Sequence, residues 1–205
     1  MKRKIPCFCD NTFEVEVPAE INLDTDPGYL DEILDGSFFN FTCPICGKKH
    51  KPEFPLSIQW PSKNLCFEII PETERGEFYR TKKPPVQKEF YTMETIIGYP
   101  EMADRLAVIR DGLEPVPVEA IKYYLYLKAE EQYPDEDIEI WYFASSAEAL
   151  EFHVHGIREN QIAIMKVPLS LYNKNLEEYK QRPKSEIFSA LRVQTYLSVK
   201  NTMRQ

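Results

Sequence analysis

Four cysteines in two close pairs constrain this chain more than any other feature. The first pair is Cys7-Phe8-Cys9, and the second is Cys43-Pro44-Ile45-Cys46-Gly47. Two turns that each aim two thiolates at one point can form a tetrahedral site, whose usual occupant is Zn²⁺. We therefore predict a shared Zn²⁺ site with Cys7, Cys9, Cys43 and Cys46 as ligands. Because four thiolates fill the coordination shell, we expect the metal to be structural.

The two cysteine turns differ in the residues that support them. In the second turn, Pro44 stiffens the backbone and Gly47 permits a positive φ. The first turn has a single residue between its cysteines, and Asp10 stands where a glycine is expected. His50 follows the second pair closely and is an alternative fourth ligand in place of Cys7, although the lysines around it indicate an exposed hairpin.

Composition and charge narrow the class of protein. The chain has 205 residues, and its five cysteines are an odd number that fits a metal site better than disulfides. We therefore expect a reducing, cytoplasmic location, with Cys66 as a buried free thiol. The net charge of −8 opposes binding to nucleic acid. No apolar run is long enough for a membrane span, and the basic start lacks the apolar stretch of a secretory signal.

Hydrophobic periodicity predicts an α+β fold in two parts. Residues 1–80 form a zinc-ribbon-like β domain with a short helical insertion, and residues 88–205 form a C-terminal α/β domain with an antiparallel meander. A polar loop at 71–87 joins them. The strands expected in the first part are 12–17, 37–42, 54–60 and 65–70, with a helix over 29–36. In the second part we expect helices over 100–110, 117–132, 169–180 and 185–203, and strands over 138–144, 150–155 and 161–167.

An ordered series of segments resembles the CpXC family, whose members have no established function. The series starts with the early cysteine pair and its following strand, and continues with the short helix before the second cysteine turn. Its members are Phe13-Glu14-Val15-Glu16-Val17, 29–36, 39–47, Gly98-Tyr99, Glu101-Met102 and Asp111-Gly112-Leu113. The resemblance covers roughly the first 130 residues and implies a zinc ribbon with the same four cysteine ligands. This chain departs from the family in its first pair, where two intervening residues are usual.

Three classes of function remain open on the sequence alone. The first is a zinc-stabilised binding or scaffold protein whose partner is an unknown protein or a second copy of the chain. The wide apolar surface of the helix predicted over 117–132 supports this class. The second is a metal-dependent enzyme that uses His153 and His155, which share one face of a strand with Glu151. The third is a nucleic-acid-associated ribbon protein that uses the basic tail over 176–205. The sequence contains no catalytic motif that indicates an enzyme, and we therefore favour the class of binding or scaffold proteins.

Overall fold

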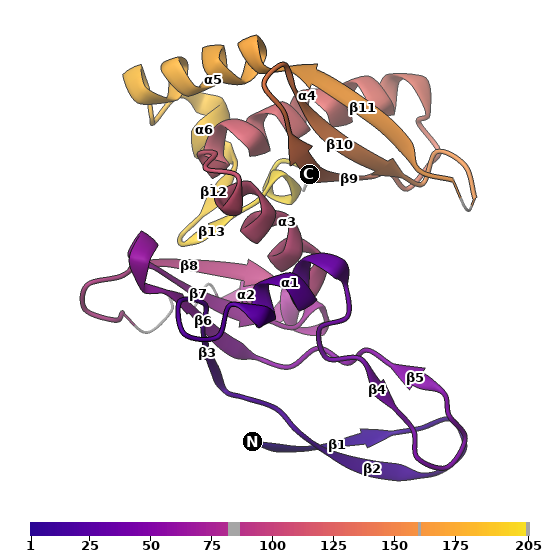
Figure 1. The fold of residues 1–205 in the computed structure, drawn as a ribbon. Helices are drawn as coiled ribbons and strands as arrows, with labels where there is room; N and C mark the ends of the chain where they lie inside the picture. Colours follow the sequence, from indigo (N-terminus) through magenta and orange to yellow (C-terminus); the bar gives the residue numbers. More distant parts are fainter. Residues whose placement is uncertain (82–86, 160, 204–205) are drawn as a thin grey trace. The chain divides into compact units, whose positions relative to one another are not determined.

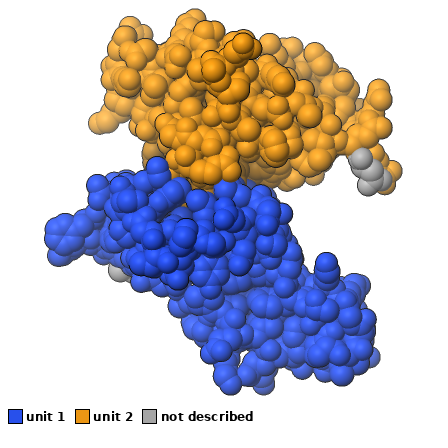
Figure 2. Space-filling model, in the orientation of Figure 1, with its two compact units in different colours: residues 1–103 blue, residues 104–205 orange. Residues whose placement is uncertain are grey.

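The computed structural model describes residues 1–81, 87–159 and 161–203. The chain divides into two compact units, Met1–Ala103 and Asp104–Gln205 (Figure 2). Each unit contains both helices and strands, so the predicted α+β class is confirmed. Among the residues that the structure describes, none of the helices combines the length and the apolar character needed to span a bilayer.

The first unit contains two short hairpins, β1 (Lys2–Pro6) with β2 (Thr12–Glu16) and β4 (Phe41–Thr42) with β5 (Lys49–His50), whose turns carry the four cysteines of the two close pairs (Figure 1). The strands of both hairpins pair antiparallel. These strands bury very little: Ile5 is the single buried residue among them. The predicted helical insertion is α1 (Gly28–Asp35), which ends at Gly36 with a φ of 79°.

A sheet supplies the core of the first unit. Its strands within this unit are β3 (Glu20–Asn22), β6 (Leu56–Trp60), β7 (Leu65–Ile70) and β8 (Thr92–Ile97), in the order β8-β7-β6-β3. The β6–β7 pair is antiparallel, whereas β3–β6 and β7–β8 are parallel. Alternate residues such as Ile58, Phe67 and Ile69 are fully buried, which is the period expected of strands.

The segment expected to be a loop at 71–87 contains helical structure. It forms a short 3-10 helix, η2 (Glu72–Glu74), and the helix α2 (Arg75–Thr81); the remaining residues, 82–86, lie outside the described part. Parallel strands need a crossover connection, and α2 lies in the connection between β7 and β8. Only Phe78 of α2 is buried, which explains why the segment reads as a polar loop.

A turn of aromatic residues replaces most of the strand predicted over 37–42. Only Phe41 and Thr42 are extended. Phe38 and Phe39 stack with ring centroids 3.9 Å apart, and both lie against Tyr99. Phe39 has a φ of 52°, a conformation incompatible with a continuous strand. Their burial explains the apolar run that suggested a strand.

Two long helices and the predicted meander form the larger part of the second unit. Strands β9 (Glu139–Ser145), β10 (Ala149–His155) and β11 (Ala163–Pro168) form an antiparallel sheet in the order β11-β10-β9. Helix α4 (Pro115–Gln132) contacts β9, and α5 (Leu169–Gln181) contacts β10 and β11, so the helices cover one face of the sheet (Figure 1). Helix α3 (Tyr99–Arg110) begins in the first unit and ends in the second.

The prediction of a helix over 185–203 was wrong. The segment contains α6 (Glu186–Ala190), a hairpin of β12 (Arg192–Val193) and β13 (Tyr196–Leu197), and a 3-10 helix, η3 (Val199–Asn201). The hairpin turns at Gln194, whose φ is 55°. The apolar side chains of this segment pack against Val116 and Ala120 of α4, and this packing outweighs its local helical pattern.

Candidate metal centre

The first cysteine turn joins β1 to β2. The backbone N–H of Cys7 donates to the carbonyl of Asn11 at 2.8 Å, and the N–H of Asp10 donates to the carbonyl of Cys7 at 3.1 Å. Asp10 has a φ of 62°, in the left-handed region. Aspartate enters this region more readily than most residues, so Asp10 closes the turn where a glycine was expected. The turn presents Cys7 and Cys9 on one side.

The second cysteine turn joins β4 to β5 in a similar way. The N–H of Cys43 donates to the carbonyl of Lys48 at 2.9 Å, and the N–H of Gly47 donates to the carbonyl of Cys43 at 3.0 Å. Gly47 has a φ of 72°, which glycine adopts without steric cost. The turn therefore aims Cys43 and Cys46 toward the first pair.

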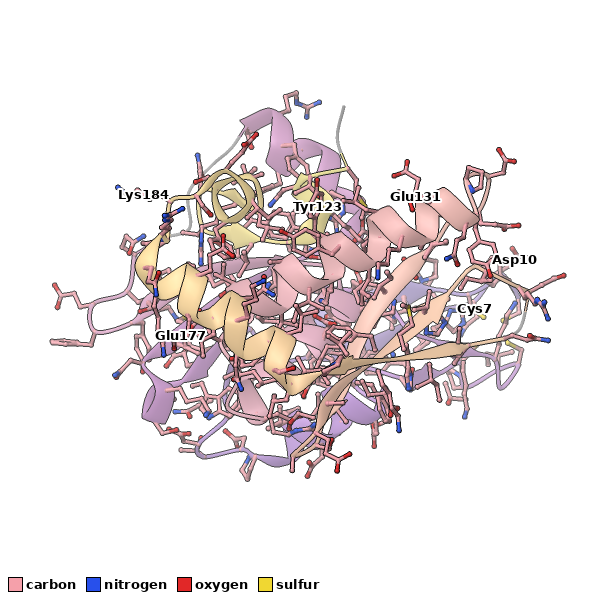
Figure 3. All side chains as sticks on the ribbon, turned by 90° about the horizontal axis from the view of Figure 1, so that it is seen from above. Cys7, Asp10, Tyr123, Glu131, Glu177 and Lys184 are labelled. Atoms are coloured by element: carbon pink, nitrogen blue, oxygen red, sulfur yellow. The ribbon has the colours of Figure 1, made fainter. Side chains whose placement is uncertain are left out.

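The four sulfur atoms converge on one point. Cys7 Sγ lies 3.5 Å from Cys46 Sγ, Cys9 Sγ lies 3.7 Å from Cys43 Sγ, and all four lie within 4.8 Å of one another. A tetrahedral ion with metal–sulfur bonds of about 2.3 Å separates its sulfur ligands by about 3.8 Å. The donor set therefore fits a tetrahedral metal ion. Cys7 and Asp10 are labelled in Figure 3, which draws the sulfur atoms in yellow.

Hydrogen bonds and burial shift the pKa values of Cys7 and Cys43 in opposite directions. Backbone N–H groups of Cys46 and Ile45 lower the pKa of Cys43 to about 6 against the effect of burial. The side-chain amide of Asn11, 3.7 Å from Cys43 Sγ, also lowers this pKa. The N–H of Cys9 favours the thiolate of Cys7, but burial and the neighbouring thiols raise its pKa to about 12. A cation at the centre would stabilise all four thiolates together. Asn11 was not among the residues expected at the site, and its place directly after the first cysteine pair is the one signal of it in the sequence.

His50 lies beside the cysteine group. Its Nε2 atom is 3.2 Å from Cys7 Sγ, and its ring lies near Phe8 and Phe13. The group in which every ligand atom lies within 4.8 Å of every other contains Cys7 and leaves out His50. This arrangement suits a histidine that donates an N–H to a thiolate ligand, a common role for groups around a metal site.

The other residues considered as ligands lie elsewhere. Cys66 is fully buried in β7, with its Sγ 3.4 Å from Ser57 Oγ. His153 and His155 share the outer face of β10, where His153 stacks on Phe143 at 4.0 Å and its Nε2 lies 3.4 Å from Glu151 Oε1. Within residues 1–81, 87–159 and 161–203, the four cysteines are the one group of three or more metal-binding side chains whose ligand atoms converge. His153, His155 and Glu151 therefore do not form a three-ligand site in this structure.

A buried ionic cluster occupies the interior of the second unit. Lys122 Nζ contacts Asp104 Oδ2 and lies 2.9 Å from Glu119 Oε1. Arg105 Nη2 lies 3.4 Å from Glu119 Oε1 and donates to the carbonyl of Leu197 at 2.7 Å. Two cations thus neutralise two carboxylates.

Backbone groups complete this cluster. The N–H of Tyr142 donates to Asp104 Oδ1 at 2.5 Å, and the N–H of Val199 donates to Glu119 Oε2 at 2.7 Å. Burial lowers the pKa of Lys122, but the two carboxylates outweigh it and raise the pKa to about 12. Burial also raises the pKa of Asp104 against the effect of Lys122, whereas Lys122 and Arg105 outweigh burial at Glu119 and lower its pKa. The cluster connects α3 and α4 to β9 and η3.

Comparisons with known proteins place the chain in a family. No solved structure matches it significantly. The chain is 32% identical over 216 residues to an uncharacterized protein of Treponema pallidum (strain Nichols), and the match covers 97% of each chain. The model of the CpXC protein family matches residues 5–122, which contain both cysteine turns. This chain therefore belongs to the CpXC family.

Proposed function

We propose that this protein is a cytoplasmic, zinc-stabilised binding or scaffold protein whose metal site is structural. The observation that carries the proposal is the convergence of four sulfur atoms at the spacing of a tetrahedral ion. Four protein ligands leave no open position for a substrate or a water molecule. An all-thiolate set also suits Zn²⁺ better than Mg²⁺ or Ca²⁺, which prefer oxygen ligands.

The thin core of the two hairpins supports a structural role for the metal. Their four strands bury only Ile5, so hydrophobic burial contributes little to holding β1–β2 against β4–β5. A metal ion that binds both turns joins residues more than thirty positions apart in the sequence. Its binding free energy becomes folding free energy for this part of the chain.

Elemental analysis of two cysteine variants tests the metal site. The purified wild-type protein should carry about one zinc ion per chain. Cys43→Ala should lose the metal and lower the melting temperature, because three thiolates leave the ion incompletely bound. Cys66→Ala is the matched control, since it also removes a buried thiol but leaves the four ligands intact. Equal zinc content in both variants would refute the proposal.

Exposed apolar side chains support the binding role. Phe8 is 84% exposed and Ile45 is 72% exposed, each at the tip of a cysteine turn. A metal-rigidified turn presents such a side chain at a low entropic cost of binding. Affinity purification from the native organism should recover a specific protein with the wild-type chain and much less with Phe8→Ser/Ile45→Ser. Equal recovery with both proteins would argue against this surface.

A further inference from the structure

An open groove of about 480 Å³ lies in the second unit. One wall is the C-terminal half of α4, where Tyr123, Tyr126, Leu127 and Glu130 follow the spacing of one helix face. Met203 contributes to the lining from the end of the described chain. The groove thus combines aromatic and aliphatic walls, and its volume falls within the range of ligand sites.

The charged side chains among the described lining residues of this groove are all acidic. Glu130, Glu136 and Asp137 line it together with the uncharged side chains, and no lysine or arginine is among the described lining residues. All three carboxylates are exposed, and none forms an ion pair within the described residues. Within the described residues the groove therefore offers three carboxylates without an ion-pair partner to a ligand, and Arg158 lines a neighbouring hollow together with Glu136 and Asp137.

The helix itself adds to the negative potential. The groove lies at the C-terminal end of α4, where the helix dipole contributes a partial negative charge. Helices commonly place a basic residue in their last turn, but α4 has none there. Carboxylates at this end destabilise the isolated helix, and a bound cation would relieve that repulsion.

The length of the groove favours a peptide over a small cation. Its lining runs from Tyr123 to Tyr133, a rise of about 15 Å along a helix. An extended peptide advances about 3.3 Å per residue, so about four or five residues fit along the wall. Figure 3 labels Tyr123 and Glu131, which lie well apart along α4.

We propose that this groove, which we call the α4 groove, binds a basic peptide segment of a partner protein. An arginine or lysine head group lies near Glu136 and Asp137, and its aliphatic stem packs on the tyrosine rings and Leu127. Arginine is especially suited, because its planar cation also stacks on aromatic faces. This inference rests on the proposed binding role of the chain and does not depend on the metal.

Selection from a phage-displayed library of random hexapeptides against the full chain tests the inference. The selected peptides should be enriched in arginine and lysine, and their binding should weaken as salt is raised. Glu136→Gln/Asp137→Asn should reduce the affinity of a selected peptide by about tenfold or more, measured by calorimetry, because hydrogen bonds to charged groups are lost. Both side chains are exposed, so the variant should retain the wild-type melting temperature.

A matched variant separates groove contacts from general charge. Glu131→Gln/Asp135→Asn removes the same charge from the same segment, but neither residue lines the groove. It should weaken the peptide by about twofold at most at physiological salt. Equal losses in the two variants, or selection of peptides without basic residues, would overturn the proposal.

Two further outcomes would identify another occupant. If free L-arginine binds as tightly as the selected peptide, the occupant of the groove is a small cation and not a peptide. A dimer in light scattering that Leu127→Glu dissociates would assign the groove to a second copy of the chain. If the peptide selection fails while the chain still binds zinc and its native partners, this inference is wrong but the proposed function stands.

Discussion

Replacing Lys122 with methionine should destabilise the second unit more than any surface change can. Lys122 is almost completely buried and contacts both Asp104 and Glu119. Methionine keeps much of the side-chain volume but removes the charge, so two buried carboxylates are left with Arg105 as the nearby cation. Removing one partner of a buried ion pair typically costs about 3–5 kcal/mol of folding free energy.

This loss is large against the stability of a unit of this size. A unit of about 100 residues has a free energy of unfolding of about 5–15 kcal/mol. If the free energy of unfolding lies in the lower part of that range, Lys122→Met should therefore remove a third or more of it. Lys128→Met is the matched control, because it removes an exposed lysine from the same helix, and it should change stability by about 0.5 kcal/mol or less.

Urea unfolding can resolve the two units through their tryptophans. The chain has two, Trp60 in the first unit and Trp141 in the second. In a Trp60→Phe background, fluorescence of Trp141 reports the second unit alone. The expected result is a lower urea midpoint for Lys122→Met and an unchanged midpoint for Lys128→Met.

A double-mutant cycle tests the stated cause. Adding Asp104→Asn to Lys122→Met restores neutrality while an amide oxygen still accepts from Tyr142 N–H. The double variant should regain about 1–2 kcal/mol relative to Lys122→Met. Wild-type unfolding of Lys122→Met, or a further loss of stability from Asp104→Asn without any rescue, would show that the buried charges do not cause the effect.

Three further predictions follow from the turns, the charges and the pKa values. Gly47→Ala should lower the free energy of unfolding by about 1 kcal/mol, because Gly47 has a positive φ, whereas Asp10→Gly should be neutral or stabilising. Equal losses of stability in thermal melts of the two zinc-loaded variants would contradict this prediction. The pKa of Asp111 is lowered from its ordinary value of 3.8, since hydrogen bonds from Arg110 and Tyr142 outweigh burial. Asp111 thus stabilises the fold above pH 3.8 and loses this effect as the pH falls further. In urea titrations, Asp111→Asn should therefore reduce the loss of the free energy of unfolding below pH 3.8. An unchanged dependence of stability on pH would count against this prediction. Finally, the net charge of −8 should prevent a gel-shift complex with single- or double-stranded nucleic acid at low micromolar protein and physiological salt, and a tight, salt-sensitive complex would contradict this.

The cysteine group was predictable because its information is local. Each turn carries two ligands within a few residues, and Gly47 marks the second turn in the sequence itself. The antiparallel meander was predictable for the same reason, since the alternation over β10 is unbroken and places Phe152 and Val154 inward. Helices α1, α3, α4 and α5 were predicted close to their observed bounds, whereas α2 was missed.

The errors share a physical cause, which is packing between residues distant in sequence. The turn at Gln194 has no glycine or asparagine to mark it, and the hairpin forms because Leu197 and Val199 pack on α4. Strand β8 went unpredicted because its pairing partner lies beyond a crossover connection. The buried ionic cluster was also out of reach, because Arg105 and Leu197 meet across ninety-two positions of chain.

X-ray absorption at the zinc K edge tests the central claim most directly. The measurement identifies the atoms bound to the metal in the purified chain, without any substitution. We predict four sulfur neighbours at about 2.3 Å and no histidine nitrogen, because Cys7 belongs to the converging group and His50 lies outside it. A shell of three sulfurs and one nitrogen, with the imidazole signature of a histidine ligand, would contradict the account, and so would protein that purifies under reducing conditions with no bound metal.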